Sequence, residues 1–271
     1  MSKLKQRAIS AALFAPIVLG SIYFSDWSFQ GLWLFVSIVC AFELSAMLDK
    51  KYGASSPLST IIKTAIPSGL FLAGLLYLNQ FISLQILLTI VCSSILLILI
   101  HGTFADVKNP VKHILPPLIA VIYVSLPLYL LADLADVQSS YNNLLAIGLI
   151  FLIWANDTGA YFVGSKLGKR KLAEAVSPNK TWEGFFGGLI LSTIVGVIFA
   201  TISGYDPLNW AFFGIAAGIF GTLGDLFESS LKRYTGVKDS GNIMPGHGGL
   251  LDRFDGFFFL IPVVWMIETL I

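Results

Sequence analysis

Charged residues are scarce in this chain of 271 residues: they make up 12% of the sequence, whereas hydrophobic residues make up 56% and the mean hydropathy is +0.80. A soluble domain has about 25% charged residues, so a soluble protein of this composition would lack the polar surface to cover itself. The composition therefore favours a chain that is solvated by lipid. The net charge of +1 gives no electrostatic reason to expect a nucleic-acid partner, and we expect none.

Cysteine is also scarce, and the sequence has no CxxC motif or other cysteine spacing of a metal site. The two cysteines, Cys40 and Cys92, stand in separate apolar runs, and we interpret both as small buried apolar residues. No internal repeat is evident, so the inverted-repeat architecture of many transporters has no support here. The sequence also offers no residue with the pattern of a covalent nucleophile.

Apolar runs long enough to cross a bilayer, about 20 residues each, recur along the chain and are separated mostly by Pro, Gly, Asn and Asp. The first run follows the basic segment MSKLKQR in the manner of a signal peptide, but SIYFSDW holds no small-x-small cleavage site, so we interpret it as a retained span. The pattern predicts an all-α, polytopic integral membrane protein with about nine transmembrane helices. These are residues 8–24, 28–48, 62–79, 81–101, 112–132, 143–163, 183–203, 208–228 and 254–271.

All 17 Lys and Arg residues fall in the N-terminal segment and in every second connection between the predicted spans, or within two residues of such a connection. The intervening connections hold only acidic charges, at Asp26, Asp133, Asp136 and Asp206. Because cytoplasmic loops are rich in Lys and Arg, this partition predicts a cytoplasmic N-terminus and a C-terminus outside.

The predicted spans differ in polarity between the two parts of the chain. Residues 1–142, with about five spans, carry few polar residues inside the membrane. Residues 143–271, with about four spans, form the predicted catalytic region and carry almost all of the unusual chemistry. Its predicted cytoplasmic loops are residues 164–182 and 229–253.

Two polar residues, Asn156 and Asp157, lie well inside the span at 143–163. A carboxylate near the bilayer centre costs about 2.5–3.5 kcal/mol, so Asp157 is expected to face a protein interior or a wet cavity. A helix–helix hydrogen bond or a different helix boundary is the alternative. Gly159 and Gly164 are small residues that favour close approach of a neighbouring helix.

The span at 208–228 ends with two acidic residues, Asp225 and Glu228, which are three residues apart and share one helical face. The loop after it contains PGHGG, in which Gly248 and Gly249 tolerate the backbone angles that aim several amides at one anion. Asp252 and Asp255 follow, again three residues apart. They share a face if a helix has begun, or they cap its N-terminus.

Acidic and basic side chains thus gather near one predicted cytoplasmic face. The carboxylates are Asp157, Asp225, Asp239, Asp252 and Asp255, and the bases are Lys180, Lys232, Arg233, Lys238 and Arg253. Crowded carboxylates repel one another without a cation, and such hard ligands suit Mg²⁺ or Mn²⁺, which bind through one or two carboxylates, waters and substrate phosphates. Because the bases suit phosphate oxygens, the set predicts phosphoryl or nucleotidyl transfer.

Other polar residues allow two interpretations each. Ser177, Lys180 and Thr181 precede the span at 183–203, where helix N-terminal amides attract anions, but Ser177 and Thr181 also suit plain capping. His247 is a candidate donor to a phosphate or a leaving group, or a brace for its loop. The remaining histidines, His101 and His113, are interpreted as interfacial and structural.

Three blocks of this sequence resemble the CDP-diacylglycerol synthases, the phosphatidate cytidylyltransferases. They are WANDTGAY from Trp154, SPNKTWEG from Ser177, and SSLKR from Ser229 with KDSG and PGHGGLLDRFD after it. The resemblance implies a reaction of CTP with phosphatidic acid that yields CDP-diacylglycerol and pyrophosphate, with Mg²⁺ and an accompanying K⁺. It also implies a homodimer in the cell's inner (plasma) membrane, with the active site facing the cytoplasm.

The resemblance assigns roles by motif position. It implies that Asp225 and Asp252 bind the metal directly, and that Asp157, Lys180, Lys232, Asp239 and Asp255 belong to the same site, with Asp255 the third candidate ligand. Two other functions stay open. An ion-coupled transporter with Asp157 and Asp225 as coupling sites would work without CTP, and another lipid nucleotidyltransferase or a lipid kinase would show similar loop chemistry.

Overall fold

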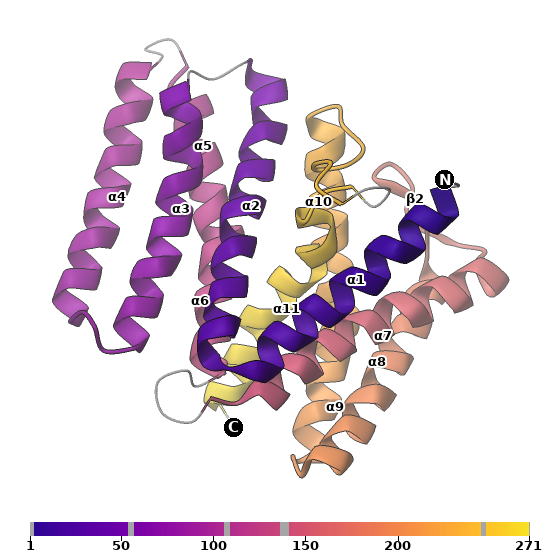
Figure 1. The fold of residues 1–271 in the computed structure, drawn as a ribbon. Coiled ribbons are helices and arrows are strands. Elements are labelled where there is room, and N and C mark those ends of the chain that lie inside the picture. Colours follow the sequence, from indigo (N-terminus) through magenta and orange to yellow (C-terminus); the bar gives the residue numbers. More distant parts are fainter. Residues whose placement is uncertain (1–2, 54–56, 106–108, 136–140, 245–247, 271) are drawn as a thin grey trace. The chain divides into compact units, whose positions relative to one another are not determined.

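A computed structural model describes residues 3–53, 57–105, 109–135, 141–244 and 248–270 (Figure 1). The chain forms two compact units. Unit 1 comprises residues 1–142 together with 234–253, and unit 2 comprises residues 143–233 together with 254–271.

Unit 1 is a helical bundle. Its helices are α1 (Lys3–Phe24), α2 (Asp26–Tyr52), α3 (Pro57–Leu78), α4 (Leu84–Ala105), α5 (Val111–Ala120), the π-helical turn η1 (Val121–Ser125) and α6 (Leu126–Leu134). The α3 helix packs against α2, α4 and α5. A reciprocal pair of hydrogen bonds between Ser25 and Ser28 fixes the start of α2, which then buries Phe29 and Trp33 in the core.

Unit 2 contains the other long helices and a small hairpin. In chain order these are α7 (Asn143–Leu167), β1 (Lys171–Ala173), β2 (Ser177–Thr181), α8 (Trp182–Ser203), α9 (Pro207–Ala216), the π-helical turn η2 (Ala217–Gly221), α10 (Thr222–Tyr234) and α11 (Leu251–Leu270), the last belonging to this unit from Phe254 onward. The antiparallel strands pair Lys171 with Thr181. This hairpin lies where we predicted only a loop, so the part of the chain that the structure describes is all-α except for these two short strands.

Close packing of α7 on α8 is built on glycine. A Cβ atom on Gly159 would lie 2.5 Å from the carbonyl oxygen of Gly187, and one on Gly164 would lie 3.4 Å from the Cα atom of Gly184. These distances leave no room for a larger side chain at Gly159. The predicted role of Gly159 and Gly164 in close helix approach is therefore confirmed.

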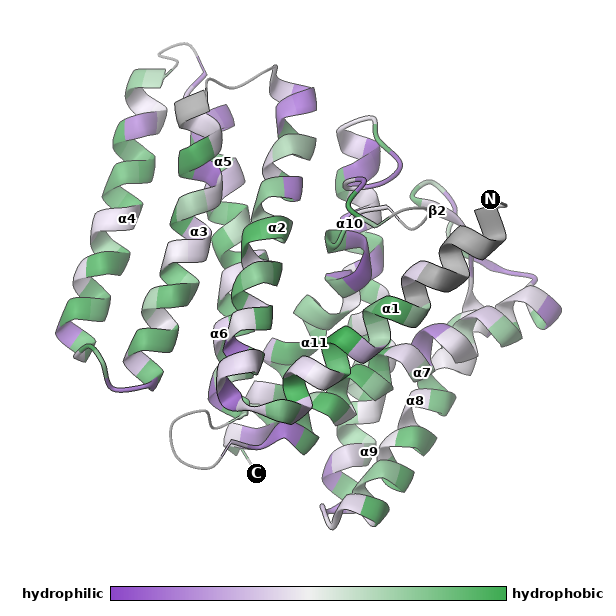
Figure 2. Cartoon of the chain, viewed as in Figure 1, coloured by the Kyte–Doolittle hydropathy of each residue, from purple (hydrophilic) through white to green (hydrophobic). Residues whose placement is uncertain are grey.

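The helices agree with a membrane protein that crosses the bilayer several times. Each of the nine predicted spans overlaps helical structure, although Asn79 and residues 81–83, at the adjoining ends of two spans, lie in the connection between α3 and α4. Seven helical segments in the described ranges are long and apolar enough to cross a membrane: Asp26–Tyr52, Ser59–Leu78, Leu84–Ala105, Val111–Leu134, Asn143–Leu167, Trp182–Ser203 and Pro207–Tyr234. Figure 2 shows hydrophobic residues along most of these helices and hydrophilic residues on α10 and in the connections. The count of nine and the orientation stay predictions.

One prediction about the apolar residues is half wrong. Cys40 is buried on α2 as expected, but Cys92 is exposed on α4. The reason is that α4 buries very little of its surface and presents apolar side chains such as Leu88 and Leu96 outward. An apolar run in a membrane protein does not distinguish a buried side from one that faces lipid.

Candidate active site

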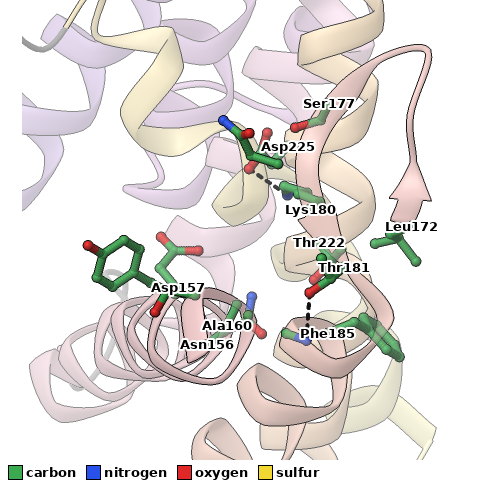
Figure 3. A pocket seen from close by; sticks show the side chains of 15 residues that line it. Asn156, Asp157, Ala160, Leu172, Ser177, Lys180, Thr181, Phe185, Thr222 and Asp225 are labelled. Atoms are coloured by element: carbon green, nitrogen blue, oxygen red, sulfur yellow. Dashed lines mark hydrogen bonds and ion pairs between the residues drawn. The ribbon is translucent and has the colours of Figure 1, made fainter. Parts of the chain in front are cut away.

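Unit 2 contains a cavity of about 620 Å³ between α7, the hairpin, α8 and α10 (Figure 3). Its polar side chains come from α7, the hairpin and α10, whereas α8 contributes Gly184 and Phe185. The residues with polar side chains that line it are Asn156, Asp157, Tyr161, Ser165, Ser177, Asn179, Lys180, Thr181, Thr222 and Asp225. The predicted site residues Asp157, Ser177, Lys180 and Asp225 therefore share one cavity.

Two residues of the cavity lining form an ion pair. The Nζ atom of Lys180 on β2 lies 2.5 Å from Oδ2 of Asp225 on α10, and Oδ1 of Asp225 accepts a hydrogen bond of 3.2 Å from the hydroxyl of Ser229. The side chains of Lys180 and Asp225 are 24% and 37% exposed, so both reach the cavity. An exposed pair contributes only about 0–1 kcal/mol to stability, which leaves both groups available for chemistry at low structural cost.

The hairpin that carries Lys180 is anchored to the start of α8. The hydroxyl of Thr181 caps α8 by accepting the amide hydrogen of Gly184, at 3.2 Å. The carboxylate of Glu183 accepts the amide hydrogens of Lys169, at 3.0 Å, and of Arg170, at 3.2 Å. The capping interpretation of Thr181 is thus confirmed, and Lys180 immediately precedes this cap in the sequence.

Two predicted carboxylates of unit 2, Asp225 and Asp157, interact electrostatically with a third, Asp255. The charge of Asp255, near the start of α11, interacts with the charges of Asp225 and Asp157 and with the ammonium group of Lys232. Lys232 in turn forms an ion pair with Glu228, which is fully buried one turn earlier on α10. Because Asp255 interacts with the like charges of Asp157 and Asp225, which both line the cavity, these carboxylates favour a bound cation.

Asp252, which the family resemblance implies as a direct metal ligand together with Asp225, is held in place by the loop that precedes α11. Its Oδ2 atom accepts hydrogen bonds from the amide of Gly249, at 2.8 Å, and from the amide and hydroxyl of Ser240, both at 3.0 Å. All three donors belong to the loop before α11, and not to the first turn of the helix that a cap would bond. Gly248 has a φ of +87°, a conformation that glycine adopts without strain.

Our sequence interpretation missed a buried carboxylate on α2. Glu43 is 2% exposed, and its oxygens accept the amide hydrogens of Leu250, at 3.1 Å, and Leu251, at 2.9 Å, and lie 3.2 Å from the Ser240 hydroxyl. The prediction that residues 1–142 carry little polar matter inside the spans is thus wrong at this position. The signal was present, since Glu43 interrupts the run VCAFELSAML just as Asp157 interrupts its own span.

Other buried polar groups of unit 1 are structural. Lys63, 1% exposed, pairs with Asp49 at 2.5 Å. The hydroxyl of Ser59 lies 3.1 Å from Nδ1 of His113, and the ring of His101 meets that of His113 edge-on, with centroids 5.5 Å apart. These contacts agree with the structural role predicted for both histidines.

Comparison with known proteins identifies the family. A family model described as "Cytidylyltransferase family" matches residues 5–271. The chain belongs to the cytidylyltransferase family. The chain is 41% identical over 155 residues to the phosphatidate cytidylyltransferase of Bacillus subtilis, which is 56% of this chain and 57% of that protein. It is 51% identical over 115 residues to that of Staphylococcus haemolyticus, 42% of this chain and 44% of that protein. These matches span about half the length of the curated relatives.

The remaining predicted site residues of this cytidylyltransferase family member lie at the end of α10, in the loop between α10 and α11, or in the first turn of α11. Arg233, Lys238, Asp239 and Arg253 are exposed to solvent, while His247 falls outside the described residues. The amide of Gly249, predicted to hold substrate phosphate, donates to Asp252 instead. In the structure, the anions that these amides bind are side-chain carboxylates.

The carboxylates of the candidate site in this cytidylyltransferase family member supply part of the ligand set that a magnesium ion needs. Within the described residues, no three acidic, histidine or cysteine side chains form a group able to enclose a metal by themselves. Mg²⁺ does not need such a group, because it binds through one or two carboxylates and takes its other ligands from water and substrate phosphates. Asp225 and Asp255 supply two interacting carboxylates, which is the kind of donor set that Mg²⁺ accepts.

Proposed function

We propose that this protein is a phosphatidate cytidylyltransferase, which converts CTP and phosphatidic acid to CDP-diacylglycerol and pyrophosphate in phospholipid biosynthesis. The observation that carries the proposal is the Lys180–Asp225 pair in a cavity bounded by membrane-length helices. A cation and a carboxylate at the wall of a cavity beside lipid suit a reaction between a charged nucleotide and a lipid. The names of the relatives support the same activity.

The reaction needs stabilisation of charge more than a strong base. An oxygen of the lipid phosphate attacks the α-phosphorus of CTP, a new P–O bond forms, and the bond to the β-phosphate breaks so that pyrophosphate leaves with the electron pair. A phosphate monoester is already largely ionised near pH 7, because its second pKa is about 6. Lys180, with Lys232 as a second base, neutralises charge that develops on the phosphoryl oxygens.

We propose Asp225, Asp252 and Asp255 as the residues that hold Mg²⁺. Asp252 and Asp255 are three residues apart on α11 and so share a face of that helix, and Asp255 interacts with Asp225. Magnesium, when bound, supplies positive charge to the phosphates of the nucleotide. An accompanying K⁺ rests on the family resemblance alone. Asp157, Asp239 and His247 complete the proposed site, with Ser177, Arg233, Lys238, Arg253, Gly248 and Gly249 as further substrate contacts.

We place the site at the cytoplasmic side of the inner (plasma) membrane, with lateral access for the acyl chains of phosphatidate. The cavity supports this arrangement because Ala160 and Phe185 add apolar lining beside the polar residues. CTP would reach the same cavity from the cytoplasm.

The decisive experiment incubates the purified, folded protein with labelled CTP, phosphatidic acid and Mg²⁺, and looks for a labelled lipid together with released pyrophosphate. Phosphorylation of diacylglycerol from ATP, without CTP turnover, would instead identify a lipid kinase. Ion flux into liposomes in the absence of CTP would identify a transporter. Light scattering on the purified protein tests the homodimer that the family resemblance implies.

A further inference from the structure

The buried carboxylate of Glu43 joins both ends of the loop that leads into α11. One end contributes the hydroxyl of Ser240, and the other contributes the amides of Leu250 and Leu251. All of these groups belong to unit 1. A carboxylate inside a membrane-length helix is costly unless it is well bonded, and here its bonds go to one loop.

Two glycines of the loop are fitted to this carboxylate. A Cβ atom on Gly241 would overlap Oε1 of Glu43, and a Cβ atom on Gly249 would overlap both the hydroxyl oxygen of Ser240 and Oε2 of Glu43. Neither glycine has a positive φ, so backbone conformation does not require glycine at these positions. The absence of a side chain at Gly241 is therefore explained by the space that the Glu43 carboxylate fills, and at Gly249 by the space that this carboxylate and the Ser240 hydroxyl fill together.

The same loop groups hold Asp252. The hydroxyl of Ser240 lies 3.2 Å from Oε2 of Glu43 and 3.0 Å from Oδ2 of Asp252, and the amide of Ser240 also donates to Asp252. The amide of Gly249 donates to Asp252 while the next two amides donate to Glu43. The loop is thus clamped between two carboxylates, and moving one of them moves the donors of the other.

We propose that Glu43 is a positioning residue, which acts through the Ser240 and Gly249 donors to fix the orientation of the Asp252 carboxylate. The inference rests on the proposed function in one respect, namely the role of Asp252 in binding Mg²⁺. Residues that orient metal ligands through hydrogen bonds typically change metal affinity 10–100-fold when they are altered.

The test compares Glu43→Gln with Ser125→Ala in the full-length protein. Ser125 is also buried in unit 1 and donates one hydrogen bond, of 2.8 Å, to the carbonyl of Pro67. Both variants lose buried hydrogen bonding, so both lower thermal stability. Only Glu43→Gln should raise the Mg²⁺ concentration for half-maximal turnover, by about tenfold, with the KM for phosphatidate unchanged.

A second readout does not depend on activity. Hydrogen–deuterium exchange of the amides in Ser240–Met244 and Gly248–Asp252 should speed up in Glu43→Gln and stay at the wild-type rate in Ser125→Ala. Gly241→Ala should reproduce the Glu43→Gln pattern, because its methyl group displaces the carboxylate. Shortening the acid in the double variant Glu43→Asp/Gly241→Ala should restore part of the lost Mg²⁺ response.

The outcomes separate the two proposals. Unchanged exchange and unchanged Mg²⁺ response in Glu43→Gln would refute the positioning role, as would an equal response in Ser125→Ala. A wild-type protein without CTP-dependent turnover would refute the proposed function. In that case the exchange measurement still decides whether Glu43 positions the loop.

Discussion

Asp225 is a carboxylate of the cavity lining that forms an ion pair, through its 2.5 Å contact with Lys180. Replacing it by asparagine keeps its size but removes its charge. We expect Asp225→Asn to lower turnover by about 10²–10³-fold, as is typical when one group that stabilises transition-state charge is lost, with little change in stability.

The matched control for this prediction is Asp206→Asn. Asp206 caps α9 by accepting the amide hydrogens of Leu208 and Asn209, and asparagine is an equally good cap. Turnover should therefore be unchanged in Asp206→Asn. Full Mg²⁺-dependent turnover of folded Asp225→Asn would show that Asp225 holds no metal.

A substitution of Lys180 tests the basic member of the Lys180–Asp225 ion pair. Loss of one charge-assisted hydrogen bond to a phosphate costs about 1.5–3 kcal/mol, so Lys180→Met should lower kcat/KM for CTP by about 10-fold to 150-fold. Lys171→Met is the control on the same hairpin, because the Lys171 ammonium donates to the carbonyl of Pro178. If both variants lost activity equally, the effect would belong to the hairpin as a whole and not to Lys180.

At the level of single residues, the sequence indicated some site residues and missed others for a definable reason. Asp157 and Glu43 both interrupt apolar runs, and the family motif lay around Asp157 alone. Nothing local to Glu43 indicates its partners, because Leu250 and Leu251 are more than 200 residues away and contribute only backbone amides. Because the donors are backbone amides, the side chains of Leu250 and Leu251 do not indicate that these residues bind a carboxylate. This contact could therefore be identified only from the structure.

Among the structural elements, α7 and α8 form the part of the cavity that depends most on close packing. We expect Gly159→Ala to destabilise the protein by about 1–3 kcal/mol, because the added methyl group meets the backbone oxygen of Gly187, which cannot rotate away. Activity should fall as well, since Asp157 lies on α7 and the hairpin that carries Lys180 leads directly into α8. Thermal unfolding in detergent, followed by turnover of the folded fraction, measures both effects.

Gly31→Ala on α2 is the matched control for this change. A Cβ atom there has nothing within 4 Å, and alanine is the better helix former by about 1 kcal/mol. Gly31→Ala should therefore leave stability unchanged or raise it. A Gly159→Ala protein as stable as Gly31→Ala would mean that the two helices are not held at the distance described.

The long helices could be predicted from the sequence, whereas the hairpin could not. Each apolar run marks its helix because a membrane forces the backbone to satisfy its own hydrogen bonds. The strands of the hairpin are only three and five residues long, and they carry charged and polar side chains without alternation. Their position depends on Glu183, whose contacts with the Lys169 and Arg170 amides appear only once α8 is in place.

For the whole molecule, the partition of the 17 basic residues remains the basis for the predicted orientation. The number of helices that cross the membrane decides this orientation, because one span more or fewer would reverse every connection after it. The connection around Tyr205, between α8 and α9, should lie outside. The hairpin with Asn179, between α7 and α8, should lie in the cytoplasm.

This orientation is tested by single cysteines in a variant that lacks Cys40 and Cys92. In intact cells, a membrane-impermeant thiol reagent should label Tyr205→Cys and leave Asn179→Cys unlabelled, while permeabilised cells should show labelling of both. Asn179 lines the cavity, so the same experiment reports which side of the membrane the proposed active site faces. Labelling of Asn179→Cys in intact cells would place the cavity outside, where CTP is not supplied, and would contradict both the orientation and the proposed reaction.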